Sequence, residues 1–151
     1  MLKLLFPHKT TEVQYSMLLL LLRLLLGGLF LIHGLDKLTA FDELQHSFFD
    51  PLGISSRSSL ILAIFGELIC ASGFIVGLFT RLALIPMITT MVVAHFMVPG
   101  VNASGQELSL IYMSIFTILF FSGPGNYSFD YLIGNAINKK NNRSRLRNPR
   151  R

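Results

Sequence analysis

Seven residues with side chains that can ionise, bind a ligand or move a proton occur inside or beside the apolar stretches of this chain. They are Arg23, His33, Lys37, Glu67, His95, Glu107 and Tyr112. An ionisable group within an apolar span is costly, so it normally faces a protein interior or a cavity. Together these residues predict a polar pocket that opens at one end of a helical bundle.

The first apolar stretch carries most of this pattern in the segment RLLLGGLFLIHGLDK, residues 23–37. At 100° per residue, Arg23, Gly27, Phe30, Gly34 and Lys37 fall within one narrow stripe of a helix. This segment is therefore the first place where a functional site is expected.

Arg23 and Glu67 are predicted to form the buried polar centre of the protein. Counted from the outer ends of their spans, Arg23 lies about 18 Å deep and Glu67 about 11–14 Å deep, at 1.5 Å per residue. An arginine side chain covers that difference, and its planar guanidinium suits a carboxylate. The pair either locks the bundle or does chemistry, with Arg23 holding a polar ligand and Glu67 carrying protons.

His33 and His95 lie at matching depths near the outer ends of two spans. Two histidines at one level could bind a haem or a metal, or flank a quinone. No HxxxH motif or third ligand accompanies them, so hydrogen-bonded histidines at the interface are the more common arrangement. We therefore expect no metal site and no haem.

The remaining candidates lie toward the same outer mouth. Lys37 can extend its ammonium group to the lipid head groups. Glu107 precedes the last span, where an acid complements a helix N-terminus, and Tyr112 is expected to form a hydrogen bond inside the bundle.

Composition indicates a single membrane domain. Of the 151 residues, 52% are hydrophobic and only 14% are charged, against about 25% charged in soluble domains. The net charge of +5 arises mainly from the C-terminus, since seven of the thirteen basic residues follow Asn138. No folded nucleic-acid-binding motif accompanies this tail, so no nucleic-acid partner is predicted. The basic tail is instead typical of a topology signal that contacts anionic lipid.

The predicted fold is all-α, a polytopic membrane four-helix bundle in contact with the lipid bilayer. Residues 1–134 form the membrane domain and residues 135–151 a basic, disordered cytoplasmic tail. A short interfacial helix is expected at about 39–49 in the first outer loop. Lysine and arginine counts in the loops place both termini in the cytoplasm. The predicted spans are about 13–35, 60–79, 82–98 and 108–122.

Three segments in order resemble the DoxX family of small integral membrane proteins. They are residues 23–37, the stretch GELICASGFIVGLFTRLA at 66–83, and the terminal block GPGNYSFD at 123–130. The resemblance implies a four-helix protein of the cell (inner or plasma) membrane. It also implies an association with membrane oxidoreductase systems, including quinone-linked ones. The single cysteine, Cys70, argues against direct dithiol chemistry in this chain.

The leading functional hypothesis is an oxidoreductase-associated subunit that contacts a quinone or a redox partner protein. The alternative is a non-catalytic assembly or small-solute-handling protein, in which an Arg23–Glu67 pair only fixes the bundle. Proton-coupled transport is a third hypothesis. It would require a homo-oligomer, because one chain is too small to build a pathway.

Overall fold

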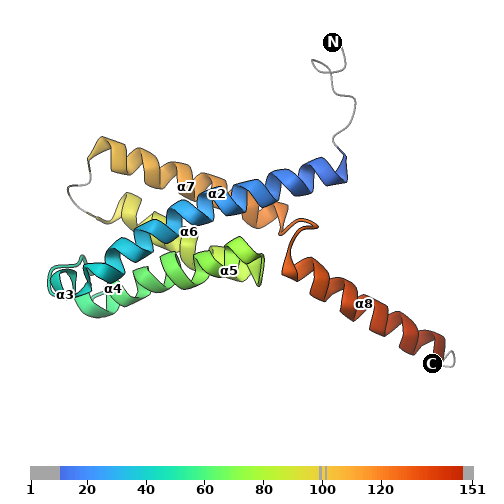
Figure 1. Cartoon of the computed structure of the whole chain (residues 1–151). Helices are drawn as coiled ribbons and strands as arrows, with labels where there is room; N and C mark the ends of the chain where they lie inside the picture. Colours follow the sequence, from blue (N-terminus) through green and yellow to red (C-terminus); the bar gives the residue numbers. More distant parts are fainter. Residues whose placement is uncertain (1–10, 99, 101, 148–151) are drawn as a thin grey trace, which may run out of the picture.

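The computed structural model describes residues 11–98, 100 and 102–147, and every regular element in these residues is a helix (Figure 1). The elements are α2 (Glu12–Thr39), α3 (Phe41–Leu44), α4 (Ser56–Ile64), η1 (Phe65–Cys70), α5 (Ala71–Val76), α6 (Thr80–Phe96), α7 (Ala103–Ser122) and α8 (Phe129–Arg147). Of these, α4, the π-helical turn η1 and α5 follow one another without a break and form one continuous helix.

The predicted all-helical bundle of apolar helices is confirmed. Among the described residues, α2, the α4–η1–α5 helix and α7 are long and apolar enough to cross a membrane, whereas α6 is apolar but has only 17 residues. The helices begin earlier than predicted because polar residues cap them ahead of the apolar runs. Thr11 forms a capping box with Gln14 before α2, and Asn102 accepts a hydrogen bond from the Gly105 N–H before α7.

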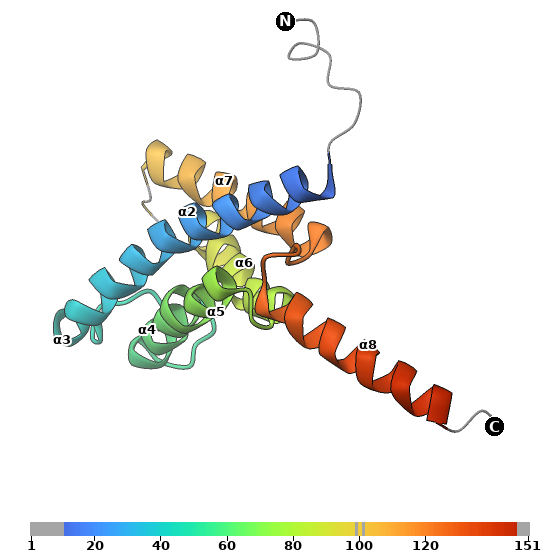
Figure 2. The ribbon, with the colours of Figure 1, turned by 45° about the vertical axis from the view of Figure 1, so that its right-hand side comes forward.

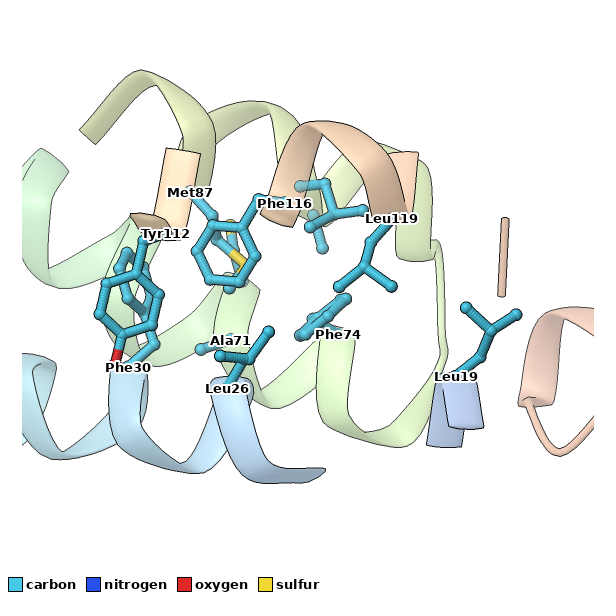
Figure 3. Close-up of a cluster of buried hydrophobic side chains, with 12 residues drawn as sticks. Leu19, Leu26, Phe30, Ala71, Phe74, Met87, Tyr112, Phe116 and Leu119 are labelled. Carbon is cyan, nitrogen blue, oxygen red and sulfur yellow. The ribbon is translucent and has the colours of Figure 1, made fainter. Parts of the chain in front are cut away.

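Aromatic side chains fill the centre of the bundle (Figure 3). The ring of Phe116 on α7 lies 5.2 Å from Phe30 of α2 and 5.8 Å from Phe74 of α5, both edge to face. Such pairs add specific geometry to the close packing that holds helices together in lipid. Many leucine and isoleucine side chains on the outside of the helices are exposed, as expected for a surface that lipid covers.

Glycines allow the helix backbones to approach closely around η1. A Cβ atom on Gly34 of α2 would lie 2.9 Å from the carbonyl carbon of Glu67. On another side of η1, a Cβ atom on Gly66 would lie 2.9 Å from the Thr90 hydroxyl of α6. The glycines of this helix do not share one neighbour, since Gly66, Gly73 and Gly77 contact three different parts of the protein.

The loop between α2 and α4 contains less helix than predicted. The expected interfacial helix at 39–49 is reduced to α3, four residues long, followed by turns. The loop is instead organised by Asp50, whose carboxylate accepts hydrogen bonds from the Ser59 hydroxyl at 2.7 Å and the Ser55 N–H at 2.7 Å. Ser55 in turn caps α4 by accepting from the Ser58 N–H.

The expectation that residues 135–151 are disordered differs from the structure. α8 continues to Arg147, across the predicted boundary at 134, and residues 148–151 lie outside the described part. Ser128 starts this helix, because its hydroxyl accepts a hydrogen bond from the Tyr131 N–H at 3.1 Å. α8 extends away from the end of the bundle where α2 begins and α7 ends (Figures 1 and 2).

Two glycines six residues apart on α2 provide a test of this packing. Gly34→Ala should lower the free energy of unfolding by about 1–3 kcal/mol, because the new methyl group meets the Glu67 backbone. Gly28→Ala, where nothing lies within 4 Å of the new atom, should leave it unchanged or raise it by up to about 1 kcal/mol. Helical circular dichroism during thermal unfolding in detergent micelles measures both, and equal effects would contradict the close approach.

The Asp50 loop should make stability depend on acid pH. Hydrogen bonds from the Ser59 hydroxyl and then from the Ser55 and Ile54 N–H groups lower the pKa of Asp50. Because the pKa of Asp50 is lower in the folded protein than in the unfolded chain, this carboxylate stabilises the fold at any pH above the ordinary carboxyl pKa of about 3.9. The stabilisation is lost as the pH falls through the pKa that Asp50 has in the folded protein. Asp50→Asn should therefore melt at a lower temperature than the wild type at pH 7, and this difference should shrink as the pH falls below about 4. Glu43→Gln, an exposed change in the same loop, should leave the wild-type profile intact.

Candidate functional site

The buried carboxylate of Glu67 forms an ion pair with Lys37. The ammonium nitrogen of Lys37 lies 2.5 Å from Glu67 Oε2 and donates a hydrogen bond to it. The Glu67 side chain is 3% exposed, whereas that of Lys37 is 26% exposed. The pair therefore has a closed acidic side and a partly open basic side.

Two features of the neighbouring helices place this pair. Glu67 lies in the π-helical turn η1, a widened turn of a kind often found at functional sites. Lys37 lies three residues beyond Gly34 on the same face of α2, and Gly34 contacts the Glu67 backbone directly. The close approach at Gly34 thus brings the lysine within reach of the carboxylate.

His33 and Tyr112 border the ion pair. The His33 ring lies 6.5 Å from the Tyr112 ring, nearly perpendicular to it, and His33 is close enough to interact electrostatically with Glu67. His33 is exposed on the surface of α2, while Tyr112 is buried and lies 5.6 Å from the Phe30 ring. The structure therefore brings three of the predicted site residues together, His33, Lys37 and Glu67, and a fourth, Tyr112, lies near His33.

The predicted pairing of Arg23 with Glu67 is wrong, although both side chains are buried. The depth estimate assumed that the two spans end at one level. In the structure Gly34 lies opposite Glu67, and Arg23 is eleven residues from Gly34 along α2, or about 16 Å. The carboxylate is thus next to Lys37, beyond the reach of Arg23.

Arg23 belongs instead to a second polar cluster near the opposite end of the bundle. One of its terminal nitrogens, Nη2, donates a hydrogen bond to the Tyr127 carbonyl, and the other, Nη1, lies against the Gly77 backbone. The side chain is 1% exposed, and its Nε and Nη1 atoms have no hydrogen-bond partner within the described residues. Asp130 provides the nearby negative charge.

Asp130 also closes the connection between α5 and α6. Its two carboxylate oxygens accept hydrogen bonds from the Phe79 N–H at 2.7 Å and the Thr80 N–H at 2.8 Å, at the start of α6. Its own N–H donates to the Gly77 carbonyl at 2.9 Å. Sequence reasoning missed this role, since the only signal was an acid in the terminal block 123–130.

His95 and Glu107 do not belong to the ion-pair cluster. His95 Nδ1 lies 3.0 Å from the Gln106 carbonyl oxygen and 3.2 Å from the Ser109 hydroxyl, and so links α6 to the first turns of α7. Glu107 is exposed in the second turn of α7. Across the part of the chain that the structure describes, no three His, Cys, Asp or Glu side chains are arranged to hold a metal ion.

An open groove of about 630 Å³ lies at the end of the bundle opposite to the ion pair. Tyr15 and Ser16 of α2, the turn at 124–126 and the first turns of α8 line it. None of the predicted site residues contributes to this groove. This groove is therefore not the pocket predicted at the outer mouth, and that pocket stays a prediction.

Replacing one or the other partner of the ion pair should lower the free energy of unfolding by different amounts. Lys37→Met leaves a buried carboxylate without its counter-charge and should lower the free energy of unfolding by about 3 kcal/mol. Glu67→Gln leaves a lysine that can turn outward, and should cost about 1 kcal/mol. The double variant should lose less stability than the two single variants lose together, because they disrupt the same interaction. Thermal unfolding followed by circular dichroism measures all three losses. Additive effects, or a larger loss in Glu67→Gln, would contradict the pairing.

Comparisons with known proteins agree with this architecture. The DoxX family model matches residues 18–100, which include most of α2 and all of η1 and α6. The chain is 31% identical over 127 residues to an uncharacterized membrane protein of Mycobacterium tuberculosis. The aligned segment covers 72% of this chain and 77% of that relative. No solved structure matches the chain. The matched family model and the apolar helices together show that this chain is a multi-pass membrane protein of the DoxX family.

Proposed function

We propose that this DoxX protein is an accessory subunit of a membrane oxidoreductase system, and that it contacts a quinone at the Lys37–Glu67 ion pair. One observation carries the proposal: a carboxylate buried among apolar helices is matched by a lysine that is still partly exposed. Ionisable groups at membrane depth are costly and commonly mark ligand or proton pathways.

The chemistry of the pair suits a quinone head group. A lysine ammonium has three donors, and one donor of Lys37 is bonded to Glu67. The others can donate to a quinone carbonyl oxygen, while the carboxylate of Glu67 can hold or release a proton beside it. The exposed ring of His33, which is near Glu67, lies 6.5 Å from the Tyr112 ring.

Access from the bilayer supports the same ligand class. A quinone moves within the apolar layer and would approach from the lipid-facing side of the helices. The side chain of His33 is exposed. Two apolar side chains close in sequence to the site residues are exposed as well: Ile32, next to His33, and Phe65, two residues before Glu67.

A chain with a single cysteine has no dithiol relay of its own, so a partner protein would supply the electrons.

Quinone binding can be measured directly on the full chain in lipid nanodiscs. Decylubiquinone titrated by calorimetry should bind the wild type above the background of empty nanodiscs. Lys37→Met and Glu67→Gln should each weaken binding about tenfold or more, because each removes a hydrogen bond to or from a charged group. Lys37→Arg, which keeps the charge, is the second variant to use if Lys37→Met unfolds.

Glu107→Gln is the matched control, since it removes an exposed carboxylate outside the cluster and should leave binding unchanged. A wild type that binds no more quinone than empty nanodiscs, or variants that bind equally well, would contradict the proposal. Such results would favour the alternative function, a non-catalytic assembly or small-solute-handling protein in which the ion pair only holds α2 to η1.

A further inference from the structure

We propose that α8 is an interfacial helix that binds anionic phospholipid head groups at the surface where the bundle ends. The helix leaves the bundle close to the start of α2 and the end of α7, which are two of the helices suited to span the membrane (Figures 1 and 2). Its first residue follows the end of α7 by only seven positions. α8 therefore begins near the membrane surface.

The first half of α8 presents exposed apolar side chains. Phe129, Leu132, Ile133 and Ile137 are each at least 44% exposed, and their spacing places them on one side of the helix. Exposed apolar side chains on one side of a helix are typical of insertion into the head-group boundary.

The second half of the helix is basic. Lys139 and Lys140 are exposed, and Lys140 continues the stripe of Ile133 and Ile137 at helical spacing. By sequence, the following turns add Arg143, Arg145 and Arg147, so cations follow directly on the apolar half. This order suits a helix whose first turns contact acyl chains and whose later turns contact phosphates.

The polar cluster around Arg23 fixes the start of α8 to the bundle. Asp130 in its first turn bonds the α5–α6 connection, and the Tyr127 carbonyl accepts from Arg23. The only carboxylate in α8 is thereby occupied, and the basic half has no acid in α8 to pair with. Charge complementarity therefore favours an anionic surface, and the bilayer supplies one next to the helix.

Anionic lipid is favoured over a protein partner because apolar and basic side chains occur together at this position. Basic residues near an anionic membrane surface each strengthen binding about fivefold. Neutralising Lys139 and Lys140 together should therefore weaken the association of α8 with the surface about 25-fold.

A fluorophore on α8 of the full-length protein tests this association. Ile137→Cys is labelled with an environment-sensitive dye in a Cys70→Ala background, and the protein is reconstituted into vesicles containing spin-labelled lipid as quencher. In phosphatidylcholine–phosphatidylglycerol vesicles the dye should be strongly quenched, and the double variant Lys139→Gln, Lys140→Gln or high salt should reduce this quenching. In pure phosphatidylcholine the wild type should already resemble the variant.

Two controls separate lipid binding from general effects. Asn138→Gln changes α8 without changing its charge, and Arg57→Gln removes one charge at the opposite end of the bundle; both should quench like the wild type. Equal quenching in both lipid mixtures would overturn the proposal. A dye that stays in water in every vesicle would also overturn it, and would leave α8 free for a protein partner.

Discussion

The contact between Gly34 and the backbone of Glu67 is the constraint on which the polar centre depends. With no Cβ at Gly34, α2 lies directly against the π-helical turn, and Lys37 reaches the Glu67 carboxylate. A charge left unpaired among membrane helices is costly, about 2.5–3.5 kcal/mol at a helix centre. The ion pair and the helix contact therefore reinforce one another, since a shift of α2 along η1 would separate the charges and also bring side chains into the backbone.

The two ends of the bundle use polar groups differently. Around Lys37 one partner of an ion pair is open to the surroundings. Around Arg23 the groups connect segments far apart in sequence: the arginine to the Tyr127 carbonyl, and Asp130 to the first N–H groups of α6. The first cluster has the features of a binding site, and the second those of a structural joint.

The apolar runs predicted the helices because their length and composition leave few other structures in lipid. The same sequence also singled out Lys37 and Glu67, because charges inside apolar runs are rare. It could not predict that they are partners, since the offset between α2 and η1 depends on where the loop at 40–55 turns. The widened turn at 65–70 could not be predicted either, because it alters the 100° spacing without any distinctive residue.

The helix at 135–147 was missed because its composition is polar, while its start depends on Ser128 and on contacts with the bundle.

The joint at Asp130 also bears on the order in which the protein can be assembled. The N–H groups of Phe79 and Thr80 obtain their acceptors from a residue made about 50 positions later, and Arg23 obtains its acceptor 104 positions later. During synthesis, the earliest span and the α5–α6 turn therefore wait with unsatisfied polar groups until residues 127–130 emerge. A segment made after α7 thus completes polar contacts of α2 and of the α5–α6 connection.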